Sequence, residues 1–168
     1  MINLVNGRGQ LGDYLRTNLP SVKIDKKVHI YHTWRPWQID SATQKQEYEK
    51  FMEFVDKNKS DKIIFTSTYS QNETYYVHYK QLAESYLIAN CKDSIIARLP
   101  SLIGNKGILK RLKEKSATPY GKIEFLPIAT AGQKIFDLVQ YNGIVKCFTL
   151  KGEEVSAELI NELIIKMT

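Results

Sequence analysis

The apolar residues of the chain gather in short runs that are separated by longer amphipathic stretches. Short runs rich in β-branched and aromatic side chains, bounded by polar or turn residues, predict buried strands. Such runs predict strands at Ile2–Asn6, Val28–Trp34, Lys62–Ser67, Ser94–Leu99, Ile123–Leu126 and Val145–Leu150.

The stretches between these runs carry apolar residues three and four positions apart, which predicts helices. For the helix that ends near Asn58, Asp40 or Ser41 is the expected N-cap, and Gln44 would complete a capping box with Ser41. Strands that alternate with helices predict an α/β sheet with helical crossovers. The expected helices are Gln10–Leu19, the helix after Asp40 or Ser41, Tyr76–Asn90, Ile108–Lys115 and Ser156–Met167.

Composition narrows the class of protein. With 168 residues, 43% of them hydrophobic, the chain fits one compact domain or one domain with a small appendage. Cys91 and Cys147 are too few for a disulfide framework and indicate thiols in a reducing compartment. No apolar run approaches the length of a membrane span, and residues 1–5 are too short for a signal peptide. We therefore expect a cytoplasmic protein with no membrane partner.

The net charge of +6 suits a phosphate-bearing ligand but does not require one. The basic residues are scattered, and at helical spacing most of the densest cluster would ring a solvated face. We therefore do not expect a nucleic-acid partner. That cluster consists of Lys106, Lys110, Arg111, Lys113 and Lys115.

Three glycines lie between the first predicted strand and the first predicted helix, in the segment Gly7, Arg8, Gly9, Gln10, Leu11 and Gly12. Glycines permit a tight turn and a close approach of backbone to ligand, and a helix N-terminus presents amides to a phosphate. Arg8 could meet an additional phosphate or point to water.

Tyr76 and Lys80 are four residues apart, so they lie on one face of the predicted helix. An ammonium beside a phenol lowers the pKa of the phenol, which suits proton transfer. The preceding strand ends in hydroxyls near Thr68, and a hydroxyl at the carboxyl end of a strand can hold a substrate carbonyl or alcohol. The alternative is that Tyr76 is part of the aromatic core.

These features, taken in order, resemble the extended short-chain dehydrogenase/reductase family of NAD-dependent epimerases and dehydratases, in a shortened form. The Gly-Gln-Leu-Gly segment looks most like that of the nucleotide-sugar 4-keto reductases. The resemblance implies a Rossmann-like core over residues 1–104 and a reduced C-terminal substrate region over residues 105–168 packed on it; a single domain over residues 1–168 is the alternative. The matching segments are 2–12, 29–34, 66–68, 76–84 (the family's YxxSKxxxE) and 97–100, with Gly104.

The resemblance also implies roles for individual residues. Tyr76 would be the catalytic acid/base, Lys80 would lower its pKa and hold the nicotinamide ribose, and Thr68 would be the catalytic hydroxyl. Dehydration is not expected, because the dehydratases follow that hydroxyl with Asp-Glu and this chain has Tyr69 and Ser70. The residues that would bind NAD or NADP are Gly7, Arg8, Gly9, Gln10, Leu11, Gly12, Lys80, Leu99 and Pro100.

The chain departs from the family in two places. Only seven residues separate Thr68 from Tyr76, fewer than the family usually has. In addition, Asp25 is the only acidic residue placed to hold the adenosine ribose, yet it is two residues from the strand at Val28, and successive parallel strands need a crossover of about a dozen residues or more. We therefore expect no parallel strand between Leu19 and Val28. The first strand would lie at or near an open edge, where a second copy could pair to form a homodimer.

We expect an NAD(P)-dependent oxidoreductase or epimerase that acts on a nucleotide sugar in surface-polysaccharide biosynthesis. One alternative is a non-catalytic relative that binds a nucleotide or nucleotide sugar, or a partner subunit; another is an unrelated α/β binding protein. The three histidines share no ligand spacing with cysteines or carboxylates, so we expect no metal site. Trp34 and Trp37 could stack on a ligand or pack over the edge of the core.

Overall fold

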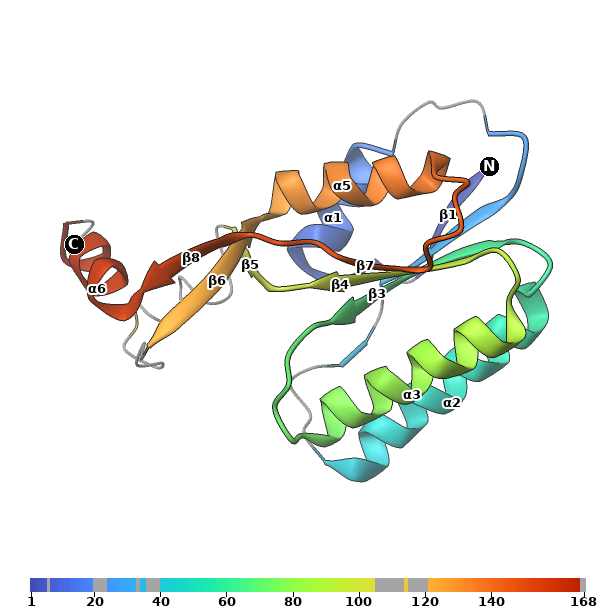
Figure 1. Cartoon of the computed structure of the whole chain (residues 1–168), viewed down its shortest axis with the longest axis horizontal. Coiled ribbons are helices and arrows are strands. Elements are labelled where there is room, and N and C mark those ends of the chain that lie inside the picture. Colours follow the sequence, from blue (N-terminus) through green and yellow to red (C-terminus); the bar gives the residue numbers. More distant parts are fainter. Residues whose placement is uncertain are drawn as a thin grey trace.

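The computed structural model describes residues 1–5, 7–19, 24–32, 34–35, 40–104, 114 and 121–166. These residues form an α/β fold with a five-stranded parallel sheet at its centre, as the alternating pattern predicted (Figure 1). The strands of this main sheet, in spatial order, are β1 (Ile2–Val5), β2 (Val28–Tyr31), β3 (Lys62–Thr68), β4 (Ser94–Leu99) and β7 (Cys147–Thr149).

Helices cover both faces of the main sheet. In Figure 1, α1 (Gly9–Thr17) and α5 (Ile128–Gln140) lie on one face, and α2 (Ser41–Asn58) and α3 (Tyr75–Asn90) lie on the other. Each pair closes its own apolar core: Leu15, Ile64 and Ile135 are fully buried on the first face, as Phe51 and Phe65 are on the second. Burial on both faces explains why the strands read as continuous apolar runs.

The first strand pairs directly with the second. Ile2 lies opposite Val28, and Val5 lies opposite Tyr31. Within the described residues β1 has no neighbour on its other side, and Asp25 lies in a bend before β2. Residues 24–27 form no strand, which agrees with the expectation that no parallel strand lies between Leu19 and Val28, and residues 20–23 of that stretch lie outside the described residues. The first strand is the edge of the sheet.

A smaller second sheet lies beyond the carboxyl ends of β3 and β4, and α6 (Ala157–Lys166) packs on it (Figure 1). Only Pro100 separates β4 from this sheet, so the chain passes directly from one sheet to the other. Its strands, in spatial order, are β5 (Ser101–Ile103), β6 (Lys122–Pro127) and β8 (Glu153–Ser156).

Several elements differ from the sequence-based expectation. Helix α5 and strands β5 and β8 were not predicted. α5 begins directly after Pro127 at the end of β6, so no polar linker marks the change from strand to helix. The predicted helix at Ile108–Lys115 and its basic cluster lie outside the described residues, apart from Glu114.

The expected capping of α2 was partly right. Asp40 is the N-cap, and its carboxylate accepts a hydrogen bond of 2.7 Å from the backbone N–H of Thr43. Gln44 does not complete a capping box. Its side chain accepts a hydrogen bond from the indole N–H of Trp34 and donates one to the backbone oxygen of Arg35, so it fixes the segment after β2.

The glycine turn depends on a close contact between α1 and the residues before it. A Cβ atom at Gly12 would lie 2.2 Å from the backbone carbon of Gly7, and backbone cannot move aside as a side chain can. We predict that Gly12→Ala lowers the free energy of unfolding by about 1–3 kcal/mol, as overpacking does. Urea denaturation measures this loss. Thr17→Ala, at the exposed end of the same helix, is the control and should change the free energy of unfolding little. A fully stable Gly12→Ala would contradict this packing.

Candidate nucleotide-binding and catalytic site

The glycine turn leaves an open cradle at the start of α1. Gly9 has a φ of 75°, a conformation that favours glycine, and a Cβ atom there would meet nothing within 4 Å. α1 begins at Gly9 beside this open space, and the backbone N–H groups of a helix's first turn have no partners within the helix. The positive end of the helix dipole and these amides suit a phosphate.

The other residues of the turn build the cradle and do not line it with side chains. The backbone of Gly12 lies against the backbone of Gly7, so neither residue points a side chain into the open space. The side chain of Leu11 is 2% exposed and belongs to the core. The side chain of Gln10 lies where a Cβ atom of Gly104 would be, so Gln10 packs against the end of β5. Only Arg8, which is exposed, could reach a ligand with a charged side chain.

Arg8 also lines a pocket of about 300 Å³ beside the turn. The pocket lies between the carboxyl ends of β1 and β2 and one side of α2, with Val5 and Tyr31 at its base. Basic side chains outnumber acidic ones on its walls, and this balance suits an anionic ligand. The remaining lining residues are Arg35, Glu47, Lys50, Glu53, Phe54 and Lys57.

A dinucleotide would fit this site at one end only. The open space at Gly9 and the helix N-terminus beside it suit a diphosphate. Asp25, however, lies just before β2, at the amino edge of the sheet, whereas the turn follows β1 at the carboxyl edge. Asp25, the one candidate that the sequence offered for the adenosine ribose, is therefore not placed to hold it, as the short gap before Val28 indicated. No described strand supplies another carboxylate there.

Lys80 is buried beneath the site. Its ammonium donates a hydrogen bond of 2.7 Å to the backbone oxygen of Thr66, and it lies 4.7 Å and 4.5 Å from the ring centroids of Trp34 and Phe65. Burial lowers the pKa of Lys80 to about 7, against a smaller opposing effect of nearby carboxylates.

Tyr76 lies next to Lys80, and the ammonium is 5.8 Å from its ring centroid. The expected lowering of the phenol pKa is wrong, because burial raises the pKa of Tyr76 to about 12. Lys80 cannot offset this effect, since its ammonium is bonded to Thr66 and its own pKa is low. A ligand that drew Lys80 toward the phenol would be needed to reverse the shift.

His32 is a neighbour of Lys80 that the sequence did not single out as functional. Its Nδ1 lies 2.8 Å from the hydroxyl oxygen of Thr66. Burial, and secondarily the charge of Lys80, lower the pKa of His32 to about 4, so it is neutral at pH 7. The side chains of His32 and Lys80 therefore both bond to Thr66, and both are buried near the carboxyl end of the sheet.

Thr68 ends β3, opposite Leu99 at the end of β4, and Pro100 follows. Its hydroxyl oxygen accepts a hydrogen bond of 3.2 Å from the backbone N–H of Ser70. Ser67 is buried, and its hydroxyl has no partner in the described part of the chain. Alternation along the strand places Ser67, rather than Thr68, on the face of Phe65, where Lys80 lies.

The predicted catalytic side chains lie at the same end of the sheet but do not form one hydrogen-bonded group. Among the described residues, no hydrogen bond joins Tyr76 to Thr68 or to Lys80. The phenol of Tyr76 is half-buried and is not bonded to backbone in this part of the chain. The catalytic roles expected for Tyr76, Lys80 and Thr68 therefore stay a prediction, because in the described part of the chain no hydrogen bond connects these side chains.

A second contact at this end of the sheet joins the two sheets. Glu124 of β6 accepts hydrogen bonds from the phenol of Tyr69, at 2.5 Å, and from the backbone N–H of Gly152, at 2.6 Å. Burial, then the bond to Glu124, raise the pKa of Tyr69 to about 12. Sequence reasoning missed this pair, because 55 residues separate its members.

Three further residues of the matched segments have structural roles. Glu84 of α3 is buried and forms a forked ion pair with Arg98 of β4, with oxygen–nitrogen distances of 2.5–3.2 Å. The pair fastens α3 to the sheet and so fixes Lys80 one turn earlier on that helix. Trp34 packs on Phe51 and Phe65 in the core, and Trp37 lies outside the described residues.

Within the described residues, His, Cys, Asp and Glu side chains form no group of three that could hold a metal ion. No helix among them is long and apolar enough to cross a membrane.

No protein-family model and no curated protein sequence matches the chain, whereas solved structures match its fold. The UDP-N-acetylglucosamine 4-epimerase from Bacillus cereus gives a TM-score of 0.73 at 15% identity, over 95% of this chain and 78% of that chain. The dTDP-4-dehydrorhamnose reductase from Bacillus anthracis, in complex with NADP, gives a TM-score of 0.76 at 12% identity, over 99% of this chain and 80% of that chain. A Bordetella bronchiseptica enzyme in complex with NAD and UDP gives a TM-score of 0.68 at 15% identity, over 99% of this chain and 77% of that chain.

The chain therefore has the Rossmann-like fold of the nucleotide-sugar epimerases and reductases, as the resemblance to the extended short-chain dehydrogenases/reductases predicted. At these identities the likeness establishes the fold, and what the chain binds and catalyses has to be argued from its own residues.

The lowered pKa of Lys80 predicts how stability depends on pH. Between about pH 7 and the ordinary lysine pKa of about 10.4, the unfolded chain binds more protons at this site than the folded chain, so the free energy of unfolding should rise with pH. Below about pH 7 this contribution levels off at its lowest value. Denaturant titrations up to about pH 9, below the tyrosine range, should follow the rise.

Lys80→Met should remove most of this rise, and Lys62, whose pKa burial also lowers, would account for a remainder. Lys45→Met, at an exposed position of α2, should leave the rise as it is. An unchanged pH dependence in Lys80→Met would mean that Lys80 is not desolvated.

Proposed function

We propose that the chain is an NAD(P)-dependent oxidoreductase or epimerase of the extended short-chain dehydrogenase/reductase type, acting on a nucleotide sugar. The observation that carries the proposal is the open cradle at Gly9, at the N-terminus of α1 and the carboxyl edge of a sheet with this fold. A role in surface-polysaccharide sugar biosynthesis in the cytoplasm is part of the proposal and rests on the fold neighbours alone.

In this proposal the turn and Arg8 hold the cofactor diphosphate, and the nicotinamide end extends toward Leu99 and Pro100. The cofactor supplies the hydride acceptor or donor. Residues 1–104 would form the cofactor-binding core, and residues 105–168 the region that meets the sugar. The Tyr69–Glu124 contact would then fix that region against the end of β3.

The proton would be moved by Tyr76. Lys80 would leave the backbone oxygen of Thr66 when the ribose binds, approach the phenol and lower its pKa. Thr68, or the unpartnered Ser67, would hold the substrate oxygen that gains or loses the proton. This rearrangement is required because burial raises the phenol pKa of Tyr76 to about 12.

A second function is favoured by the edge position of β1. A non-catalytic relative that binds a nucleotide or nucleotide sugar, alone or as a partner subunit, needs the diphosphate cradle but not the adenosine half of a dinucleotide site. The described chain offers the cradle without an acidic strand beside it. Calorimetric titration with NADH, NADPH and a panel of nucleotide sugars separates the two functions, since only the first requires a nicotinamide cofactor.

The turn can be tested by filling its open space. We predict that Gly9→Val abolishes binding of nucleotide in the calorimeter, because the side chain would occupy the cradle. The substitution also strains a positive φ, at a cost of about 1–3 kcal/mol. Gly121→Val is the matched control: Gly121 has a φ of 64°, is equally open, and lies at the start of β6. It should lose similar stability and keep its affinity. Equal affinity in both variants would remove the turn from the site.

Catalysis can be tested on α3. If the chain turns over, Tyr76→Phe should slow it about a hundred- to ten-thousandfold while affinity is kept, because general acid–base catalysis is worth that much. Lys80→Met should reduce both turnover and cofactor affinity, and Thr68→Val should fall between the two. Tyr75→Phe, on the exposed neighbouring residue, is the control and should have no effect.

Full turnover in Tyr76→Phe would contradict the role of the phenol. A wild-type chain that binds nucleotide sugar but turns over none of the panel would favour the second function.

A further inference from the structure

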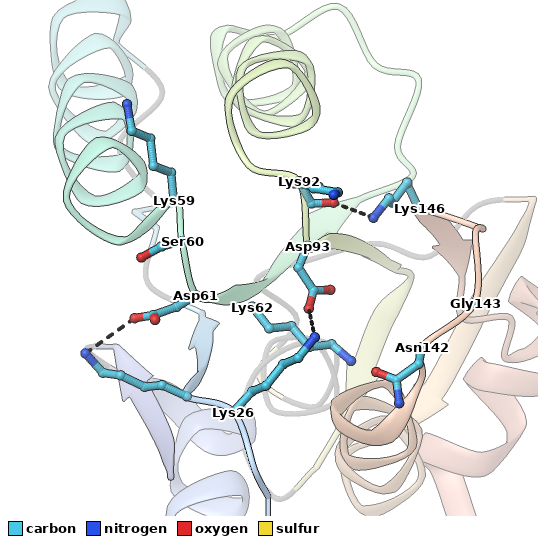
Figure 2. Close-up of a pocket in the computed structure, with 11 residues that line it drawn as sticks. Lys26, Lys59, Ser60, Asp61, Lys62, Lys92, Asp93, Asn142, Gly143 and Lys146 are labelled. Carbon is cyan, nitrogen blue, oxygen red and sulfur yellow. Dashed lines mark hydrogen bonds and ion pairs between the residues drawn. The ribbon is translucent and has the colours of Figure 1, made fainter.

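A basic pocket lies at the amino edge of the main sheet, opposite the glycine turn. Its volume is about 750 Å³. Asp61 and Asp93 are its acidic lining residues, and Ser60, Asn142 and Gly143 complete the described lining. Figure 2 shows side chains from several loops around this space. The lysines that line it are Lys26, Lys27, Lys59, Lys62, Lys92 and Lys146.

Four segments bring these lysines together, and each leads into a parallel strand at its amino end. Residues 26–27 precede β2, residues 59–61 precede β3, residues 92–93 precede β4, and residues 142–146 precede β7. Parallel strands begin at the same edge, so charges far apart in sequence converge. β3 has seven residues, which separates this edge from Thr68 by roughly 20 Å.

Lys62 forms the buried base of the pocket. Its ammonium donates a 2.9 Å hydrogen bond to the backbone oxygen of Val139 and a second bond to that of Tyr141, at the C-terminus of α5. An ammonium has three donors, so one remains for a ligand. Desolvation lowers the pKa of Lys62, Asp93 raises it, and Lys26 and Lys146 lower it further. The charges of these residues therefore act on one point.

The rim keeps an excess of positive charge. Lys26 lies 3.6 Å from Asp93 and Lys27 lies 3.5 Å from Asp61, and both lysines are well exposed. In the described part of the chain, no hydrogen bond or ion pair engages the side chains of Lys59 or Lys92. The ammonium of Lys146 donates to the backbone oxygen of Lys92, at 2.7 Å, which holds the loop before β7 against the loop before β4.

We propose that this pocket is a second binding site, for a compact ligand that carries two or more linked phosphate groups. Lysine ammonium groups suit phosphate oxygens as point charges, and several of them around one concavity favour a multiply charged anion. The two aspartates position Lys26 and Lys27 without neutralising the set. This site is independent of the nucleotide site proposed at the carboxyl edge.

The phosphates could belong to a free small molecule or to a lipid headgroup. Ile144 is 93% exposed, and it follows the pocket residues Asn142 and Gly143, so a membrane surface is the alternative source. The buried base favours the free molecule, because Lys62 is 2% exposed and a flat headgroup layer could not reach it.

The test is calorimetric titration of the whole chain with inorganic tripolyphosphate. We expect saturable binding of one ligand that added salt weakens. The double variant Lys59→Gln/Lys92→Gln removes two side chains that hold no structural contact in the described residues, and it should weaken binding by roughly tenfold, as two exposed charges would. Lys45→Gln/Lys122→Gln, with the same change of charge at exposed sites outside the pocket, should not.

Asp93→Asn should tighten binding, because it releases Lys26 to the ligand. A saturating concentration of NADH should not displace tripolyphosphate, and displacement would assign the anion to the glycine turn and overturn the proposal. Equal loss in the two double variants, or no saturable binding, would also overturn it. Pelleting with phosphatidylserine vesicles in the absence of tripolyphosphate binding would overturn it in favour of a membrane contact.

Discussion

The direct pairing of β1 with β2 determines what the rest of the fold can offer a ligand. β1 pairs with β2 from Ile2–Val28 to Val5–Tyr31, and no described strand pairs with its other side, so β1 is an edge strand within the described chain. The glycine turn that follows β1 therefore opens at the side of the sheet. In the proposed function a diphosphate would meet the amides of α1 there, but in the described part of the chain no acidic strand lies beside the turn for the adenosine end of a dinucleotide.

The two ends of the sheet differ in how their charges are held. At the carboxyl end, Lys80 is bonded to Thr66 among aromatic rings, and the phenol of Tyr76 is neutral over the physiological range. Ligand binding would have to change these contacts before chemistry could begin. At the amino end, six lysines already surround an open volume. The side chains at the carboxyl end would have to rearrange around a ligand, whereas the lysines at the amino end already surround the pocket.

The sequence predicted what depends on local pattern. The buried apolar runs predicted β1 to β4, and the glycine turn between β1 and α1 was placed correctly. The short gap before Val28 predicted that no parallel strand precedes it, and residues 24–27 form none. Contacts between distant residues could not be predicted in this way. Tyr69 meets Glu124 only because the second sheet lies past the end of β3, and the six lysines converge only because four parallel strands begin at one edge.

Burial also reversed one prediction. The spacing of Tyr76 and Lys80 correctly placed both on one face of α3, and spacing alone indicated that the lysine would lower the phenol pKa. The aromatic residues Trp34 and Phe65 enclose the ammonium, and their effect on its hydration is a property of the packed core. Helix α5 was missed for a related reason, since its apolar face follows a strand without a break.

The central claim is that the amides of the glycine turn hold a cofactor diphosphate although β1 is an edge strand. The most direct measurement is the change in backbone amide chemical shifts of the isotope-labelled chain during titration with NADPH and NADH. The account predicts saturable shifts at the amides of Gly9, Gln10 and Leu11, with Lys59 and Lys92 unchanged. Unchanged amides at the turn under saturating cofactor, or shifts confined to the opposite edge of the sheet, would contradict it.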